Sequence, residues 1–366
     1  LSCVVNLDRL QTALEAATFA AHMAQQDTPP DAEYTGNLAD IAGKDLREAL
    51  AKGCLDDDWN GAGELIAFIK ERAGLLVERA PDVYTYPHRT FQEYLAAAHL
   101  CTLPGFPQEA ARLLRENPAQ WREVVMMAVG IMARIKKLPY IALYVVDQLC
   151  SAPAPEKEAR SEVDPVDWRA AWQAGEAILE IGINDARQAN ANTVDRVRDW
   201  LVALLETGAL TPVECAAAGR ALAELGDPRE DVTGVDAMRF CYVPTGPFVM
   251  GASKNETRLM HPLTGETLVV PPDPRASGDE GPVHVQNIPS GYWMARYPIT
   301  NAQFDAFVKD EGYKKAEWWN WSEAALSWWK GNERIGPRDY GMPFNLSNHP
   351  VVGLSLIHIS EPTRPY

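Results

Sequence analysis

The sequence predicts a multidomain protein in which a mainly α-helical region, residues 1–232, precedes a partial α+β region, residues 233–353. In the first region apolar residues recur at intervals of three and four, which is the period of an amphipathic helix. Two segments that end at Gly182 and Gly226 repeat one pattern 44 residues apart. From Arg239 onward, short apolar runs are interrupted by proline and glycine, which is typical of strands joined by tight turns.

Residues 1–104 predict several helices and a β-hairpin, the arrangement of a winged-helix domain. The expected helices span residues 6–26, 38–52 and 64–73, and the expected hairpin strands span residues 75–79 and 83–86. Gly53 and Gly74 follow the second and third helices as glycine C-caps do. Thr90 and Glu93 have the spacing of a capping box, which predicts that the next helix begins at Thr90.

Residues 105–232 predict an array of helices resembling HEAT-type repeats. Strongly apolar helices are expected at 121–135 and 140–149, and a proline-rich linker at 151–164. Ala174-Gly-Glu-Ala-Ile-Leu-Glu-Ile-Gly182 then matches Ala218-Gly-Arg-Ala-Leu-Ala-Glu-Leu-Gly226, and the 44-residue spacing lies within the period of such repeats. Small residues in both copies allow close helix packing, and a glycine ends each copy.

Composition excludes several classes of function. A net charge of −16 repels a phosphate backbone, so we expect no nucleic-acid partner. The longest apolar run, residues 124–135, is too short to cross a bilayer, so we expect no membrane association. The cysteines are scattered without any C-x-x-C pair, which argues against disulfides and zinc and favours a reducing, cytoplasmic location. They are Cys3, Cys54, Cys101, Cys150, Cys215 and Cys241.

No nucleotide site is expected in the first region. Gly36 and Gly43-Lys44 do not form a phosphate-binding loop, because six residues separate the glycines and Asp45 follows the lysine. His88 and Arg89 allow two interpretations: a contact to a nucleotide or a neighbouring domain, or a structural helix start. We favour the structural one, since an isolated histidine beside a helix cap is usually structural.

The segment His88-Arg-Thr-Phe-Gln-Glu-Tyr-Leu-Ala-Ala97 resembles the one that closes the nucleotide-triphosphatase module of the NACHT family. In that family the ATP-binding core lies upstream, and the sequence contains none of it. The resemblance implies that residues 1–104 are the helical end of a NACHT-type module. Oligomerisation through the missing NTPase part is then an expectation.

Three blocks organise the second region. They are Val243-Pro-Thr-Gly-Pro-Phe-Val-Met-Gly251, Asp279-Glu-Gly-Pro-Val-His284, and Trp293-Met-Ala-Arg-Tyr-Pro-Ile-Thr-Asn-Ala-Gln-Phe-Asp-Ala-Phe307. Within the third block, Thr300 and Gln303 have capping-box spacing and predict a helix that starts there. In this order the blocks resemble the formylglycine-generating enzyme family, also called sulfatase-modifying factors. Residues 253–278, between the first two blocks, are polar and proline-rich and predict a long excursion on the surface of the fold.

The resemblance implies a C-type-lectin-like fold and an oxidase that converts a protein cysteine to formylglycine with oxygen and copper. Complete catalytic members hold copper with two cysteines, whereas residues 233–353 contain only Cys241, which we expect in the core. Related branches bind iron through histidines and carboxylates. His261, His284 and His349 show no metal-ligand spacing, and His284, near Asp279 and Glu280, is the best of them. We therefore assign no catalytic, cofactor-binding or metal residue, and no cofactor, to this chain.

Two further features lie near the C-terminus. The cluster of Trp318, Trp319, Trp321, Trp328 and Trp329 is either a ligand-binding platform or core, and we favour core because tryptophans are usually mostly buried. Residues 354–366 resemble a translated sequencing adapter and are left out of the fold prediction.

Two functions follow from these patterns. Either the parent protein is an oxidase of the formylglycine-generating kind linked to an NTPase, or the region has kept the fold as a ligand- or protein-recognition module of a signalling or bacterial defence NTPase. Fold alone does not decide between them. Protein partners are expected in both cases, and catalysis is not expected from the chain as written.

Overall fold

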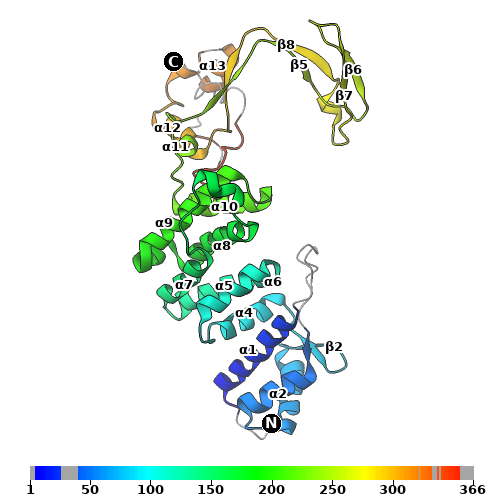
Figure 1. The fold of residues 1–366 in the computed structure, drawn as a ribbon, viewed down its shortest axis with the longest axis vertical. Helices are drawn as coiled ribbons and strands as arrows, with labels where there is room; N and C mark the ends of the chain where they lie inside the picture. Colours follow the sequence, from blue (N-terminus) through cyan, green and yellow to red (C-terminus); the bar gives the residue numbers. More distant parts are fainter. Residues whose placement is uncertain (1–4, 26–39, 321, 332–335, 338, 355–366) are drawn as a thin grey trace. The chain divides into compact units, whose positions relative to one another are not determined.

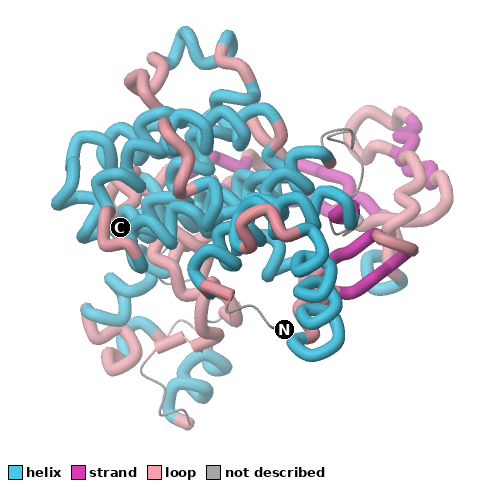
Figure 2. Tube along the Cα trace, turned by 90° about the horizontal axis from the view of Figure 1, so that it is seen from below, coloured by secondary structure: helices cyan, strands magenta, loops and turns pink. Residues whose placement is uncertain are grey.

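The structure is a computed structural model that describes residues 5–25, 40–320, 322–331, 336–337 and 339–354. It divides into two compact units, residues 1–227 and residues 228–366. Helices make up most of the first unit, and the second contains several short strands, so the predicted order of a helical region followed by a mixed one is confirmed. Figure 2 distinguishes the helices from the strands by colour. Among the described helices, none has both the length and the apolar character that crossing a bilayer requires.

The first unit begins with a small domain of helices and three short strands. Its helices are α1 (Leu7–Ala24), α2 (Gly43–Cys54), α3 (Trp59–Phe68), continued by a π-helical turn at Ile69–Ala73, and α4 (Arg89–Leu100). Its strands β1 (Ile41–Ala42), β2 (Val77–Ala80) and β3 (Val83–Thr85) form an antiparallel sheet in the order β1-β3-β2. The predicted hairpin is confirmed, and Gly74 ends the third helix with φ of +63° as expected.

Three sequence predictions in this domain are wrong. Ile41 belongs to a strand rather than a helix, because it pairs with Tyr84 at the edge of the hairpin. Gly53 lies inside α2 and not after it. A Cβ there would lie 2.7 Å from the Cβ of Ala13, so the glycine allows α1 and α2 to approach closely. Thr90 is not an N-cap, because α4 already begins at Arg89 and Glu93 binds Arg89 instead, at 2.5 Å.

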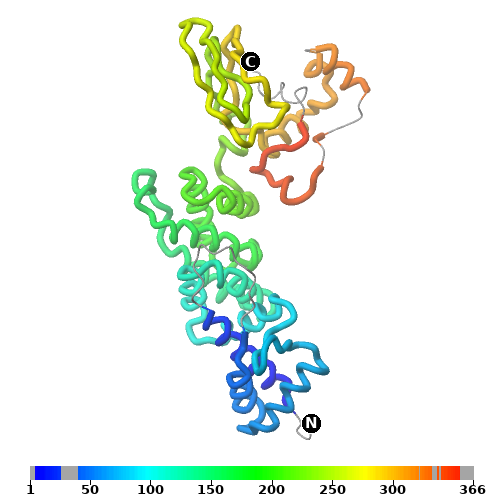
Figure 3. The backbone as a smooth tube through the Cα atoms, turned by 90° about the vertical axis from the view of Figure 1, so that its right-hand side faces the viewer, coloured from blue at the N-terminus to red at the C-terminus, as the bar shows by residue number. Residues whose placement is uncertain are grey.

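An array of packed helices follows (Figure 3). It consists of α5 (Phe106–Glu116), α6 (Pro118–Gly130) with a π-helical turn at Ile131–Ile135, α7 (Pro139–Leu149), a 3-10 turn at Lys157–Glu162, α8 (Pro165–Ile181), α9 (Ile183–Thr207) and α10 (Pro212–Leu225). Four of these helices begin with proline, whose fixed φ and missing N–H suit the first helical position. The core is continuous from α4 to α10 and includes the fully buried Trp121 and Trp168.

The internal repeat forms the C-terminal halves of α8 and α10, which pack against each other. Gly182 and Gly226 end the two helices with φ of +99° and +89°, values that favour glycine. A Cβ on Gly175 would lie 3.1 Å from the Leu201 side chain and 3.4 Å from the Cβ of Ala221. The small residues of the repeat therefore allow close helix packing, as the sequence predicts.

A reciprocal pair of hydrogen bonds joins α1 to α6 across the boundary between the small domain and the array. The backbone carbonyl of His22 accepts from the Gln120 side-chain amide, and the His22 Nε2 lies 3.2 Å from the Gln120 carbonyl oxygen. The ring of His22 is buried and meets Trp121 edge-on, with the ring centroids 4.6 Å apart. Burial lowers the pKa of His22 to about 4, so the ring is neutral at pH 7.

The second unit contains a long two-stranded ribbon and a small helical body. β4 (Phe240–Val243) pairs with β9 (Tyr292–Ala295), and β5 (Gly246–Met250) pairs with β8 (His284–Ile288). The two ladders follow one another along the same two segments, separated by a bulge in which residues 244–245 face residues 289–291. At the far end of the ribbon β6 (Thr257–Met260) and β7 (Thr267–Val270) form another hairpin (Figure 1).

This last hairpin lies within the long excursion that the sequence predicts at residues 253–278, although its strands were not predicted. Both of its strands contain threonine, leucine, valine or methionine residues that favour a pleated conformation. His261 forms the turn, since its Nδ1 accepts from the backbone N–H groups of Leu263 (3.3 Å) and Thr264 (3.1 Å). Because proline and charged residues surround these strands, the alternation was hidden in the sequence.

The helical body of the second unit contains α11 (Glu230–Thr233), α12 (Asn301–Lys309), a 3-10 turn at Ala316–Trp318 and α13 (Glu323–Lys330). Phe304, Tyr313 and Trp319 form its buried core, and Trp328 and Trp329 pack against them. The core interpretation of the tryptophan cluster is therefore confirmed for these residues, whereas Trp321 lies outside the described residues. Residues 355–366, most of the expected adapter-derived segment, also lie outside them.

Gly251 explains why the first two sequence blocks belong together. It ends β5 with φ of +96°, and a Cβ there would lie 2.7 Å from the carbonyl oxygen of Glu280 and 2.9 Å from that of Pro282. The adjoining Ala252 N–H donates to the Glu280 carbonyl at 3.1 Å. The carboxylate of Glu280 in turn accepts from the backbone N–H of Ser277 at 3.1 Å and fixes this turn.

Replacing Gly251 by alanine therefore destabilises the ribbon both through its backbone conformation and through steric overlap. We expect Gly251→Ala to lower the free energy of unfolding by about 3 kcal/mol, measured by urea denaturation with tryptophan fluorescence. The matched control is Gly265→Ala, which has φ of +71° but no neighbouring atom within 4 Å of the added Cβ. The control should lose only about 1 kcal/mol. Equal losses in the two variants would contradict the close approach.

The buried His22 predicts a pH-dependent stability of the first unit. In the unfolded chain His22 takes up a proton near pH 6.5, but in the folded chain only near pH 4. Its contribution is therefore fully present above pH 6.5 and is lost as the pH falls toward 4, by about 3 kcal/mol in total. Urea denaturation of the wild type and of His22→Gln between pH 4 and 7.5 measures this. The variant should show a shallower pH dependence, and identical slopes would refute the assignment to His22.

Candidate functional site

The first turn of α12 forms several hydrogen bonds to other parts of the second unit. Thr300 is its N-cap and forms the predicted capping box: the Thr300 hydroxyl accepts from the Gln303 N–H at 3.3 Å, and the Gln303 side chain accepts from the Thr300 N–H at 3.1 Å. The remaining donors of both side chains bind the α11 region. Thr300 donates to the Val232 carbonyl at 2.7 Å, and Gln303 donates to the carbonyls of Asp231 (3.2 Å) and Gly234 (3.1 Å).

Asn301 binds the loop of residues 344–349 to this turn. Its side-chain nitrogen lies 2.8 Å from the carbonyl oxygen of Phe344, 2.9 Å from that of Leu346 and 3.2 Å from that of His349. One NH₂ group has two hydrogens, so three contacts require sharing. The backbone N–H of Asn301 also donates to the His349 carbonyl at 2.8 Å. The loop thereby satisfies N–H groups that lack partners at a helix start.

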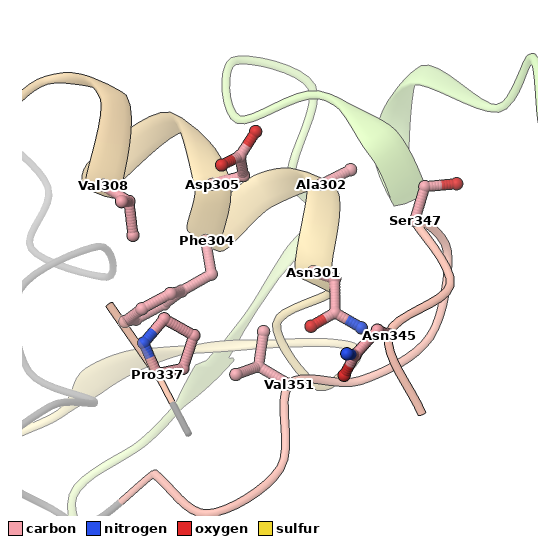
Figure 4. A pocket seen from close by; sticks show the side chains of 9 residues that line it. All are labelled: Asn301, Ala302, Phe304, Asp305, Val308, Pro337, Asn345, Ser347 and Val351. Carbon is pink, nitrogen blue, oxygen red and sulfur yellow. The ribbon is translucent and has the colours of Figure 1, made fainter. Parts of the chain in front are cut away.

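A pocket of about 360 Å³ lies between α12 and this loop (Figure 4). Its lining residues are Asn301, Ala302, Phe304, Asp305, Val308, Pro337, Asn345, Ser347 and Val351. Figure 4 shows Phe304 next to Pro337 on one side and Asn301 next to Asn345 on the other. The pocket thus combines an apolar floor with a rim of amide, hydroxyl and carboxylate groups, the composition that small-ligand sites typically have.

The rim carries a compensated charge. Lys309 pairs with Asp305 one helical turn away at 2.5 Å, and Asn345 donates to Asp339. Accepting from the Gly341 N–H and from the Asn345 side chain lowers the pKa of Asp339, which stays charged and lies outside the lining. Asp305, the one carboxylate among the lining residues, has a cationic partner in Lys309.

The residues considered as metal ligands lie apart and have local partners. His261 forms the β6–β7 turn, the Nδ1 of His284 lies 2.8 Å from the Pro282 carbonyl oxygen, and the Nδ1 of His349 lies 2.8 Å from the Asn348 side-chain oxygen. Glu280 binds Ser277 and does not join His284. Among the described residues, no group of three or more histidines, cysteines or carboxylates is arranged to hold a metal ion.

Cys241 lies on β4 and is exposed, so the expectation that it belongs to the core is wrong. In the described residues no other element covers the ribbon at this point. The copper site implied by the family resemblance needs two thiolates, and Cys241 is the one cysteine that the sequence contains after residue 215. The residues of this chain therefore do not fit that copper site.

His88 and Arg89 have structural surroundings in the first unit. His88 is the N-cap residue of α4, although its side chain makes no capping bond, and its ring lies 6.2 Å from that of Phe91. Arg89 pairs with the mostly buried carboxylate of Glu93. The ion pair favours the structural interpretation for Arg89, and the ring of Phe91 is the neighbour that the structure gives the His88 side chain.

Comparison with known proteins gives two family matches. Residues 227–360 match the Sulfatase-modifying factor enzyme 1-like domain, and residues 17–100 match the Winged helix-turn-helix domain C-terminal to NACHT. The chain carries both of these domains. Both resemblances inferred from the sequence blocks are therefore confirmed, whereas a lectin fold and HEAT-type repeats remain predictions.

Two curated relatives match short parts of the chain. The hercynine oxygenase of Mycolicibacterium smegmatis is 36% identical over 78 residues, which is 21% of this chain and 14% of the relative. The hercynine oxygenase of Mycolicibacterium thermoresistibile is 40% identical over 48 residues, which is 13% of this chain and 10% of the relative. The chain thus spans only a small part of the length of these relatives. No solved structure gives a significant match.

The pocket of the sulfatase-modifying-factor-like domain was missed by sequence reasoning, although one signal was available. Asn301 occupies the first helical position directly after the Thr300 cap, and asparagine is a poor residue for a helix interior. An asparagine there indicates that its side chain forms hydrogen bonds outside the helix. The structure shows that it binds three carbonyl groups of one loop.

The hydrogen bonds of Asn301 predict that two substitutions at this position reduce the stability by different amounts. Asn301→Ala removes the donors and should cost about 2 kcal/mol of stability. Asn301→Asp should cost more, because a carboxylate has no hydrogen to donate and would face three carbonyl oxygens. Hydrogen exchange of residues 344–351, together with urea denaturation, measures both effects. Asn287→Ala, which alters an exposed amide on β8, is the control. If Asn301→Ala is as stable as the control, Asn301 does not anchor the loop.

Proposed function

We propose that this chain is the peptide-recognition part of a NACHT-type protein, and that the pocket at the start of α12 binds one apolar side chain of an extended peptide. The observation that carries the proposal is the composition of the pocket. Phe304, Val308 and Val351 provide apolar surface, while Asn345 and Ser347 provide groups that can donate to and accept from peptide bonds.

The size of the pocket supports the same class of ligand. A volume of about 360 Å³ lies near the lower end of the range for small-ligand pockets, roughly 300 to 1,000 Å³. A pocket of this volume can hold one branched side chain with its two flanking peptide groups. The Asp305–Lys309 pair leaves no isolated charge on the rim, which favours a neutral segment over a charged one.

A second candidate is cysteine oxidation by the sulfatase-modifying-factor-like domain. It is favoured by the match at residues 227–360 and by relatives named as oxygenases. The single cysteine after residue 215 argues against a copper site built from this chain alone. Peptide recognition is needed in either case, so the pocket proposal is compatible with both candidates.

Binding of a minimal peptide tests the proposal. N-acetylvaline methylamide supplies one apolar side chain and two peptide groups, and its addition to methyl-labelled protein should shift the resonances of Val308 and Val351 with a saturable dose dependence. Ala302→Trp places a large side chain on the lining and should abolish the shifts. Ala306→Trp lies on the same helix outside the lining, is exposed, and should preserve them.

Absence of saturable shifts in the wild type, or equal behaviour of the two tryptophan variants, would overturn the pocket proposal. N-acetylglycine methylamide is the ligand control, because it has both peptide groups without the apolar side chain and should bind more weakly. A parallel arm incubates the protein with a cysteine-containing peptide, copper and oxygen. Formylglycine detected by mass spectrometry would favour the second candidate.

A further inference from the structure

β4 has one paired edge and one open edge among the described residues. On the paired edge, the Arg296 N–H donates to the Arg239 carbonyl at 2.8 Å, so these two residues form a hydrogen-bonded pair. In an antiparallel ladder hydrogen-bonded and non-hydrogen-bonded pairs alternate. The backbone groups of Cys241 therefore face β9, and those of Phe240 and Tyr242 face the open edge.

The four residues of this edge lack the charged side chains and prolines that often prevent strand pairing, and Pro244 with the following bulge limits pairing to these residues. The strand reads Phe240-Cys-Tyr-Val243, without lysine, glutamate or proline. Both faces of the ribbon are apolar and exposed at this point: Tyr242 and Trp293 are 56% and 54% exposed on one face, and Met294 is 55% exposed on the other. A two-stranded ribbon with two uncovered apolar faces is marginal alone and gains stability from further strands.

We propose that β4 pairs with β4 of a second copy of this chain, antiparallel, about a two-fold axis through Cys241. In this register Phe240 of each copy lies opposite Tyr242 of the other. All the outward-facing backbone groups of the four residues then pair, which gives a sheet in the order β9-β4-β4-β9. The same surface is used by both copies, as a closed dimer requires.

Other two-fold registers of this strand use the edge less completely. An axis through Phe240 leaves Tyr242 opposite Met238, outside the strand, and an axis through Tyr242 places Phe240 opposite Pro244, which has no N–H to donate. The open edge of β9 is also less suitable. Self-pairing there would align Trp293 with Ala295, whereas β4 aligns aromatic residues in both of its outward pairs, and aromatic cross-strand pairs are the more favourable.

The charges near β4 also permit contact between two copies of the strand, although the whole chain carries a net charge of −16. β4 contains no acidic residue, and the neighbouring Arg239 of one copy would lie opposite the uncharged Val243 of the other. Arg239 is already paired with Asp231 at 2.9 Å. The proposed edge contact thus brings no two like charges into direct opposition.

The register makes one specific geometric prediction. Cys241 of one copy lies in a non-hydrogen-bonded pair with Cys241 of the other, where Cα atoms are about 4.5 Å apart. A disulfide spans Cα separations of roughly 4.4 to 6.8 Å, so the two thiols can be joined without moving the backbone. The remaining described cysteines are buried or half-buried, which makes Cys241 the exposed one among them.

The experiment uses the full chain with Cys3 replaced by serine, and light scattering coupled to size exclusion under reducing conditions. We expect a dimer. Diamide then takes up two protons and two electrons from the two thiols and joins their sulfurs, and mass spectrometry should find the Cys241 peptide linked to itself. Cys241→Ser should remove the link and keep the dimer.

A matched pair of lysine variants tests the edge. Tyr242→Lys places a charge on the open edge of β4 and should abolish both dimer and link. Tyr292→Lys adds the same charge to the same ribbon at a residue whose backbone faces β4, and should retain both. A monomeric parent chain, a dimer without the Cys241 link, or a dimer that survives Tyr242→Lys would each overturn the proposal. The peptide pocket on α12 plays no part in this test.

Discussion

The arrangement of the second unit depends on the N–H groups at the start of α12 that have no partner within the helix. A helix start leaves N–H groups without intrahelical partners. Thr300 and Gln303 satisfy some of these groups and bind the α11 region, while Asn301 and the adjoining backbone bind the loop of residues 344–349. One helical turn therefore fixes two segments that are distant from it in sequence. The pocket exists because the same turn holds the loop at a fixed distance from the helix.

A structural feature could be predicted from the sequence when the contacts that determine it join residues close together in the chain. The capping box at Thr300, the repeat ending at Gly182 and Gly226, and the hairpin after Gly74 rest on neighbours a few residues away, and they are confirmed. Gly53 was misread because the residue that requires a glycine there, Ala13, is 40 positions distant. Tertiary contacts overrode a correct local pattern in that case.

The candidate site shows the same limit. The sequence pointed to histidines, cysteines and tryptophans, the residue types that carry chemistry, yet the three histidines lie apart, His261 in a turn, His284 at the start of β8 and His349 in a loop. Cys241 was expected in the core because it lies in an apolar run, but the run forms a ribbon that no described element covers. Periodicity reports which face of a strand is apolar and does not report whether anything packs on it. The pocket itself could not be foreseen, since its walls come from segments some forty residues apart.

The bonds between His22 and Gln120 have a mechanical consequence. Each of these residues binds the backbone carbonyl of the other through its side chain. A rotation of α1 about its own axis therefore breaks both bonds together, and the edge-on contact between His22 and Trp121 resists sliding of α1 along α6. These contacts therefore oppose both rotation and sliding of α1 against α6, and a movement of one helix requires a movement of the other.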